Sequence, residues 1–180
     1  MLDVSPRGYE HLSRVERRKL KTKEAIFNAA IELFRQKGFD NTSVEEITEK
    51  ADVGKGTFFN YFPRKEAILA FLGEKRMAAI LKLIERKLNK DWPAREGLKM
   101  IFDTLAAENE KDKALVRLVV FESMKREGAV QEVSERREDL CRTFQYLIER
   151  GQKKGEFKSE VSAAKAAQIL LAIYFQSLLM

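Results

Sequence analysis

The sequence has almost none of the residues from which disulfides, metal centres and most catalytic sites are built. It contains one cysteine, Cys141, and one histidine, His11. A single cysteine excludes an intramolecular disulfide and a multi-cysteine metal site, which suits a reducing compartment. No second histidine and no glycine-rich phosphate loop is present, so neither a histidine-based catalytic site nor a nucleotide site is indicated. We therefore predict that the protein is not an enzyme and needs no metal or cofactor.

Long apolar runs and targeting signals are missing as well. No apolar stretch reaches the length of a membrane span, and the opening residues, MLDVSPRGYEHL, lack the basic and then apolar layout of a signal peptide. Apolar residues make up 44% of the chain, which is enough for one or two well-packed cores. The sequence thus predicts a cytoplasmic protein with no membrane partner.

What the chain does have is a positive charge that is concentrated near its start. The formal net charge is +6, and residues 14–23 contain a single acid, Glu16. The cations of this stretch are Arg14, Arg17, Arg18, Lys19, Lys21 and Lys23. A local basic run is the electrostatic footprint expected of a nucleic-acid binder. Taken alone, it also fits a solvated helix face or a flexible arm.

Helical periodicity extends through most of the sequence and predicts an all-α fold. Ser13 and Glu16 form a capping box for a helix that continues to residue 37, where Gly38 ends it. Further helices are expected over 64–88, from Pro93 onward, and over 114–127, 133–150 and 162–180, with Gly128 and Gly151 as stop signals. The apolar run 116–121 could equally be a buried strand. We predict a helix there because the chain has only one such run and no partner for it.

Residues 42–65, TSVEEITEKADVGKGTFFNYFPRK, predict two short helices joined by a tight turn. Thr42 and Ser43 each stand three residues before a glutamate, which gives two overlapping capping boxes for the first helix. Four residues, 51–54, separate it from the second. This is the helix-turn-helix arrangement, whose second helix can lie in a DNA major groove.

The second short helix carries an unusual number of aromatic residues. Phe58, Phe59, Tyr61 and Phe62 fall within five consecutive positions, so they must point to more than one side. Phe58 and Phe62 are one helical turn apart and are expected in the core. Phe59 and Tyr61 are then left facing outward beside lysines, and nucleic acid is the partner that such a surface suits.

The stretch ADVGKGTFFNYFPRKEAIL, residues 51–69, together with KGFDNTSVEEI just before it, resembles the signature of the tetracycline-repressor (TetR) family of bacterial regulators. The resemblance implies an N-terminal DNA-binding head, residues 1–62, and a C-terminal effector-binding and dimerisation domain, residues 63–180, that begins with a connecting helix over 64–88. It also implies a homodimer through the last two helices, 133–150 and 162–180. The final helix has no stop signal, so we expect the native chain to continue beyond Met180.

Carried over residue by residue, the resemblance implies a reading face for double-stranded DNA. The groove-facing residues would be Lys55, Gly56, Thr57, Phe59 and Asn60. Tyr61 and Lys65 would contact phosphates, and Thr42 or Ser43 would do so at the start of the preceding helix. Asn60 offers a donor and an acceptor that together suit an adenine edge.

The implied function is that of a dimeric, ligand-responsive repressor that binds a pseudo-palindromic operator and is released by a small hydrophobic or amphipathic effector. An effector pocket would lie among Trp92, Phe102, Phe121, Met124, Phe144 and Tyr146. The alternative is a nucleoid-associated or protein-binding scaffold of the same fold without an inducer, in which those side chains fill one another. The sequence leaves both possibilities open.

Overall fold

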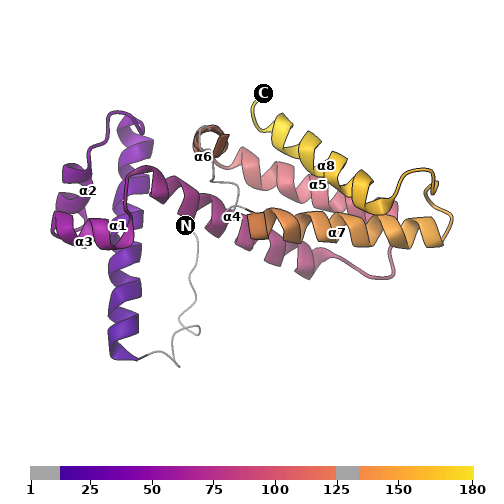
Figure 1. The fold of residues 1–180 in the computed structure, drawn as a ribbon, viewed down its shortest axis with the longest axis horizontal. Coiled ribbons are helices and arrows are strands. Elements are labelled where there is room, and N and C mark those ends of the chain that lie inside the picture. The colour runs from indigo at the N-terminus through magenta and orange to yellow at the C-terminus, as the bar shows by residue number, and fades with distance from the viewer. Residues whose placement is uncertain (1–12, 125–133) are drawn as a thin grey trace. The chain divides into compact units, whose positions relative to one another are not determined.

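The computed structural model describes residues 13–124 and 134–180, and every regular element in those residues is a helix (Figure 1). This confirms the predicted all-α fold. The helices are α1 (Arg14–Lys37), α2 (Val44–Lys50), α3 (Lys55–Tyr61), α4 (Glu66–Lys87), α5 (Ala94–Glu110), α6 (Lys113–Met124), α7 (Ser134–Lys153) and α8 (Ala163–Ser177).

The chain divides into two compact units between Ile68 and Leu69, inside α4. The first unit contains α1, α2, α3 and the start of α4. The second contains the rest of α4 and the helices α5 to α8. The boundary that the sequence suggests, after residue 62, lies shortly before this point.

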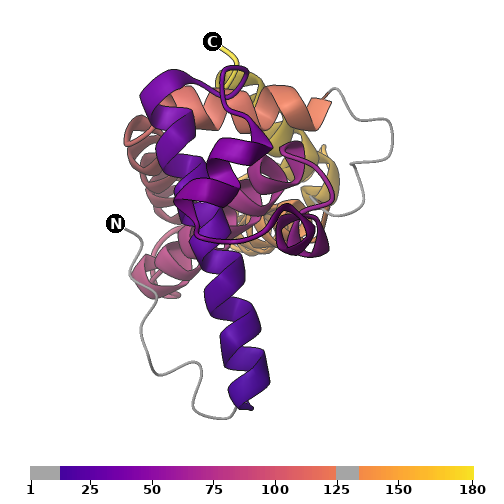
Figure 2. The same cartoon turned by 90° about the vertical axis from the view of Figure 1, so that its left-hand side faces the viewer.

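In the first unit, α1 begins and ends as its sequence predicts. The Ser13 hydroxyl accepts from the Glu16 amide at 3.2 Å, and the Glu16 carboxylate accepts from the Ser13 amide at 2.8 Å. Gly38 ends the helix at φ +86°, a conformation that costs glycine little. The next residue, Phe39, packs edge-on against Phe34, with ring centroids 5.0 Å apart. The N-terminal half of α1, which carries the basic run, extends beyond α2 and α3 in both views (Figures 1 and 2).

In the second unit, α7 packs along α8 and against α5. Their shared core also includes buried residues of α4. The large buried side chains of this core are Ile80, Ile84, Ile101, Leu105, Leu140, Phe144, Leu147, Ile148 and Tyr174. The ambiguous apolar run 116–121 lies within α6, which confirms the helix predicted there. The expected end of that helix at 127 and the expected break at Gly128 lie outside the described residues.

Two boundaries differ from the sequence prediction by a few residues. Helix α4 begins at Glu66, because residues 63–65 form a turn in which the Ala67 amide donates to the Arg64 carbonyl at 3.1 Å. Only one of the two overlapping capping boxes at α2 exists. Ser43 is the N-cap and pairs with Glu46, whereas Thr42 lies before the helix.

The prediction that Gly151 stops α7 is wrong. The helix continues to Lys153, and the residue with positive φ is Gly155, at +74°. A Cβ placed on Gly151 would lie 2.4 Å from the ring of Phe157 and 2.9 Å from the Cβ of Ala94. Gly151 is therefore needed for close packing of the following loop on the helix, and not for a turn.

Gly151→Ala is expected to lower the free energy of unfolding by about 1–3 kcal/mol, because the Phe157 ring must move to admit a methyl group. Urea unfolding followed by the fluorescence of Trp92, the single tryptophan, would measure this. Gly56→Ala is the control, since no atom lies within 4 Å of a Cβ at that helical position. An unchanged midpoint for Gly151→Ala would contradict the packing described here.

Candidate nucleic-acid interface

Helix α3 has a buried side and an exposed side, as its aromatic residues predict. Phe58 is fully buried, with an exposed fraction of 0%, and Phe62 is buried next to it with the ring centroids 6.1 Å apart. Phe59 is 50% exposed even though its ring meets that of Phe58 edge-on at 5.3 Å. One side of α3 thus belongs to the core and the other presents an aromatic ring to solvent.

The other residues assigned to the groove lie on accessible parts of the same helix. Lys55, Gly56 and Asn60 are exposed, while Thr57 and Tyr61 are half-buried. Lys55 forms an ion pair with Glu45 of α2 at 2.5 Å, which links the start of α3 to α2. The hydrogen bond from Lys55 is the main reason that the pKa of Glu45 is lowered. The structure therefore leaves the expected reading face open to a ligand.

At the start of α2, the structure separates the two residues that the sequence treats as equivalent. Ser43 is exposed and caps the helix through the Glu46 amide at 3.2 Å. Thr42 is only 2% exposed, and its hydroxyl donates to the Gly38 carbonyl at 2.7 Å. Of the two, Ser43 is the exposed residue, and its hydroxyl donates to the Glu46 carboxylate at 2.9 Å.

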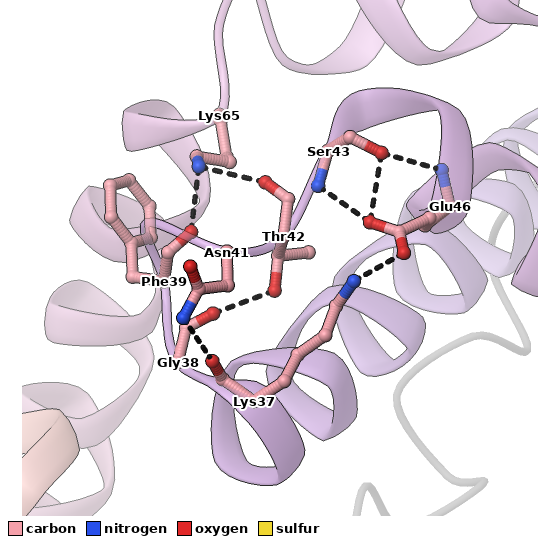
Figure 3. A network of polar contacts seen from close by, with 8 residues as sticks. All are labelled: Lys37, Gly38, Phe39, Asn41, Thr42, Ser43, Glu46 and Lys65. Atoms are coloured by element: carbon pink, nitrogen blue, oxygen red, sulfur yellow. Dashed lines mark hydrogen bonds and ion pairs between the residues drawn. The ribbon is translucent and has the colours of Figure 1, made fainter.

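Glu46 is the centre of a polar network at the end of α1 and the start of α2 (Figure 3). It forms an ion pair with Lys37 and accepts from both the amide and the hydroxyl of Ser43, each at 2.9 Å. The hydrogen bond from Lys37, followed by those from Ser43, lowers the pKa of Glu46 to about 2 from its ordinary value of 4.5. The ionised carboxylate thus joins α1 to the N-cap of α2.

The Glu46 network should make the stability of the protein depend on pH. Because the pKa of Glu46 is lower in the folded state, its contribution is fully present above pH 4.5 and is lost as the pH falls from 4.5 toward 2. The stability difference between wild type and Glu46→Gln should be constant near neutral pH and smaller at pH 3.5. Urea titrations with circular dichroism would check this, with the exposed Glu49→Gln as control. A difference that stays constant down to pH 3 would contradict the assignment.

Lys65, which the resemblance assigns to a phosphate, makes its described contacts within the first unit. It precedes the first turn of α4, and its ammonium group points into the loop between α1 and α2 (Figure 3). There it donates to the carbonyls of Phe39 at 2.6 Å and Thr42 at 2.8 Å. Backbone carbonyls carry no sequence signature, so only the folded chain could reveal these partners.

The candidate effector residues of the second unit differ in their burial. Phe102 and Phe144 stack with their ring centroids 5.3 Å apart and their planes at 18°, and Phe144 is fully buried. Trp92, Phe121 and Tyr146 are exposed. Met124 is the last residue of α6, and its side chain lies outside the described part of the structure.

A surface hollow of about 340 Å³ lies at the end of α4 and along α5. It is lined by Lys87, Trp92, Glu96, Lys99, Met100, Asp103 and Thr104. Of the candidate effector residues, Trp92 is the one that takes part. The aromatic pattern of the sequence does not indicate the other lining residues, because most of them carry charged or polar side chains.

The described residues contain neither a membrane-spanning helix nor a cluster of metal ligands. None of the helices in 13–124 and 134–180 is long and apolar enough to cross a membrane. The same residues contain no cluster of three histidine, cysteine, aspartate or glutamate side chains that could hold a metal ion.

Helices α2 and α3 form a helix-turn-helix in which one face of α3 is exposed, and a separate helical unit follows. This arrangement defines a helix-turn-helix DNA-binding regulator. Residues 26–71 match the family model of bacterial regulatory proteins of the tetR family, and residues 95–178 match that of a tetracyclin repressor-like C-terminal domain. The chain belongs to the tetR family of transcriptional regulators, as its signature residues predict.

Individual relatives agree with this assignment. The HTH-type transcriptional regulator YvdT of Bacillus subtilis is 32% identical over 95 residues, which cover 53% of this chain and about half (49%) of YvdT. The fatty acid metabolism regulator protein of Bacillus subtilis is 25% identical over 149 residues, 81% of this chain and 75% of that protein. Among solved structures, Thermus thermophilus FadR, a transcriptional repressor in complex with lauroyl-CoA, is similar with a TM-score of 0.71 and 30% identity. That similarity covers 87% of this chain and 81% of FadR.

Proposed function

We propose that the protein is a cytoplasmic, dimeric repressor that binds a pseudo-palindromic operator through α3 and is released by an amphipathic effector. The single observation that carries this proposal is the two-sided character of α3. Phe58 holds the helix in the core, while Phe59, Asn60 and Lys55 are exposed together on its accessible part. This combination of an apolar ring, an amide and a cation suits the floor and walls of a major groove.

Each exposed group of α3 has a chemical counterpart in DNA. The side-chain amide of Asn60 can pair with adenine in a bidentate way, in which its NH₂ group donates to N7 and its oxygen accepts from the N6 amino group. The ring of Phe59 and the methyl group of Thr57 can contact thymine methyl groups. Gly56, with open space around it, lets the backbone approach the bases. Lys55 supplies charge, which attracts phosphate without reading sequence.

The face formed by α7 and α8 supports a dimer. Ile169 and Ile173 of α8, the helix that packs along α7, are half-exposed or more. A second copy of the chain would cover these apolar side chains by a two-fold interface. Such a dimer presents two copies of α3, and we expect the two operator half-sites to lie about 34–36 Å apart, one turn of DNA.

For the effector we propose a long-chain acyl-CoA thioester. The support is the lauroyl-CoA complex of Thermus thermophilus FadR, which resembles this chain over most of its length. An effector releases DNA only if it binds the non-binding conformation of the dimer more tightly than the DNA-bound one. The proposal therefore requires acyl-CoA and operator to weaken each other's binding by the same factor.

Selection from a random DNA pool, followed by fluorescence anisotropy on the selected duplex, tests this function. We expect an inverted repeat to be enriched, and lauroyl-CoA to release the duplex. Coenzyme A without an acyl chain and free laurate are the controls, and both should be much weaker. Enrichment of no sequence would contradict operator binding, and full retention of DNA at saturating acyl-CoA would contradict the effector class.

The scaffold without an inducer is the second candidate, and the stacked pair Phe102 and Phe144 favours it. The two rings stack on each other and so occupy space that an apolar effector would otherwise use. A thermal-shift measurement with acyl-CoA thioesters separates the two functions. A scaffold should show no shift with any of them, whereas an effector that binds the folded state must raise the melting temperature.

The basic start of α1 is expected to contribute phosphate contacts. Arg17 and Arg18 are exposed there, so replacing both with glutamine should flatten the plot of log affinity against log salt by roughly 0.9 per lost contact. The exposed pair Lys153 and Lys154 provides a control with the same charge change in the second unit. Equal slopes for wild type and the Arg17 and Arg18 variant would show that this run stays away from DNA.

A further inference from the structure

We propose that Lys65 is a positioning residue of the DNA-binding head, which fixes the α1–α2 loop and the start of α2 without contacting phosphate itself. This inference rests on the proposed reading of DNA by α3. The Lys65 ammonium group donates to the carbonyls of Phe39 at 2.6 Å and Thr42 at 2.8 Å (Figure 3). It also lies over the Phe39 ring, 4.2 Å from the centroid.

These contacts use most of the binding capacity of the ammonium group. A lysine side chain has three N–H donors and no acceptor, and two of the three are directed at carbonyl oxygens of the loop. Its charge is further stabilised by the face of the Phe39 ring. Lys65 is half-buried, in contrast to the exposed Arg64 beside it in the chain. A phosphate would therefore compete with contacts inside the head.

Side chains form several hydrogen bonds to the backbone of the loop that Lys65 contacts. The Asn41 amide donates to the Lys37 carbonyl at 3.0 Å, and the buried Thr42 hydroxyl donates to the Gly38 carbonyl at 2.7 Å. Lys65 donates to the carbonyls of Phe39 and Thr42, and the Phe39 carbonyl also accepts from the Thr42 amide at 3.2 Å. Hydrogen bonds from a charged donor are the strongest of this kind, so Lys65 contributes more to the order of the loop than either neutral donor.

The location of this contact in the chain explains why it matters for DNA binding. Thr42 immediately precedes Ser43, the N-cap of α2, and Lys65 follows α3 by a short turn. The bond from Lys65 to the Thr42 carbonyl thus joins the two ends of the helix-turn-helix. Closing the segment at both ends restricts the orientations of α3 and of the Ser43 hydroxyl before DNA arrives. Such preorganisation raises affinity because less freedom is lost on binding.

Lys65→Met tests this inference, with Arg64→Met as a matched control that removes the adjacent exposed cation. Affinity for the selected operator would be measured at several salt concentrations, at a temperature where circular dichroism shows each variant to be folded. We expect Lys65→Met to weaken binding about tenfold at every salt concentration, as for the loss of one charge-assisted hydrogen bond, with the wild-type salt slope. Lys65→Arg retains donors and charge and should recover part of the loss.

A second measurement needs no DNA. Hydrogen exchange at the amides of residues 39–43 should be faster in Lys65→Met than in wild type and unchanged in Arg64→Met. A salt slope that is reduced by about 0.9 in Lys65→Met would overturn the inference, because it is the mark of a lost phosphate contact. Unchanged operator affinity of the folded Lys65→Met variant, or unchanged hydrogen exchange at the loop amides, would overturn it as well. A wild-type protein that binds no DNA would contradict the proposed function alone, since the exchange measurement would still decide whether Lys65 holds the loop.

Discussion

Phe144→Ala is expected to lower the free energy of unfolding by about 3–5 kcal/mol, the largest effect on stability that we expect from a single substitution in this chain. Phe144 is fully buried in the core of the second unit and stacks on Phe102. Truncation removes the apolar surface of the ring and leaves a cavity that the rigid helices around it fill only in part. Urea unfolding followed by Trp92 fluorescence, at a fixed protein concentration, would measure the loss.

Tyr146→Ala is the control for this prediction. Tyr146 lies two residues along the same helix, but it is exposed, and its described ring contact is with the Arg150 guanidinium at 5.9 Å. Its truncation should cost less than about 1 kcal/mol. If Phe144→Ala lowered the free energy of unfolding as little as Tyr146→Ala, Phe144 would line a cavity instead of packing in the core. That result would support the effector pocket expected from the sequence.

Asn60→Ala is expected to produce the largest loss of sequence discrimination. A good bidentate contact between an amide and adenine discriminates against other bases by about 1–3 kcal/mol, or roughly tenfold to more than a hundredfold in affinity. Asn60 is exposed and lies next to the exposed Phe59, so its removal should not disturb the core that Phe58 forms. Fluorescence anisotropy with the selected operator and a scrambled duplex would measure both affinities.

The control for Asn60→Ala is contained in the same experiment. Asn60 carries no charge, so affinity for the scrambled duplex and the salt slope should both equal those of wild type. A uniform loss on both duplexes would point to a disturbed fold. Unchanged affinity for the operator would show that the exposed face of α3 has been assigned wrongly.

Local features of the fold could be predicted from the sequence because their causes lie within a few residues. The capping box of Ser13 and Glu16 fixes the start of α1, and Gly38 fixes its end. The separation of Phe58 from Phe59 likewise follows from helical geometry alone, since adjacent positions point to different sides. The family signature lies in this same region, which is why the candidate reading face could be named in advance.

Features that depend on contacts between distant residues could not be predicted. Gly151 appears in the sequence as a stop signal, yet its role is set by Phe157 and Ala94 packing against the bare backbone. Thr42 and Ser43 are equally good caps by sequence, and the choice falls on Ser43 because the Thr42 hydroxyl bonds to the Gly38 carbonyl. The sequence likewise gives no sign that Lys65 donates to two carbonyls of a loop more than twenty residues earlier.

The packing of the second unit was the least predictable part for a related reason. Aromatic residues at helical spacing serve equally well as core or as pocket walls, and composition does not distinguish the two. Phe102 and Phe144 stack on each other, while most residues that line the hollow beside Trp92 have charged or polar side chains. Only the packing of α4 and α5 brings those side chains together.

We propose that the exposed face of α3 reads base edges and that Asn60 is the residue that recognises adenine. The most direct test replaces each adenine of the operator in turn by 7-deazaadenine, which lacks the N7 acceptor but pairs normally. Wild type should lose about tenfold in affinity at one adenine in each half-site, whereas Asn60→Ala should bind the substituted and unsubstituted operators equally. Wild-type affinity that is insensitive to every replacement, or an Asn60→Ala protein that loses as much as wild type, would contradict the claim.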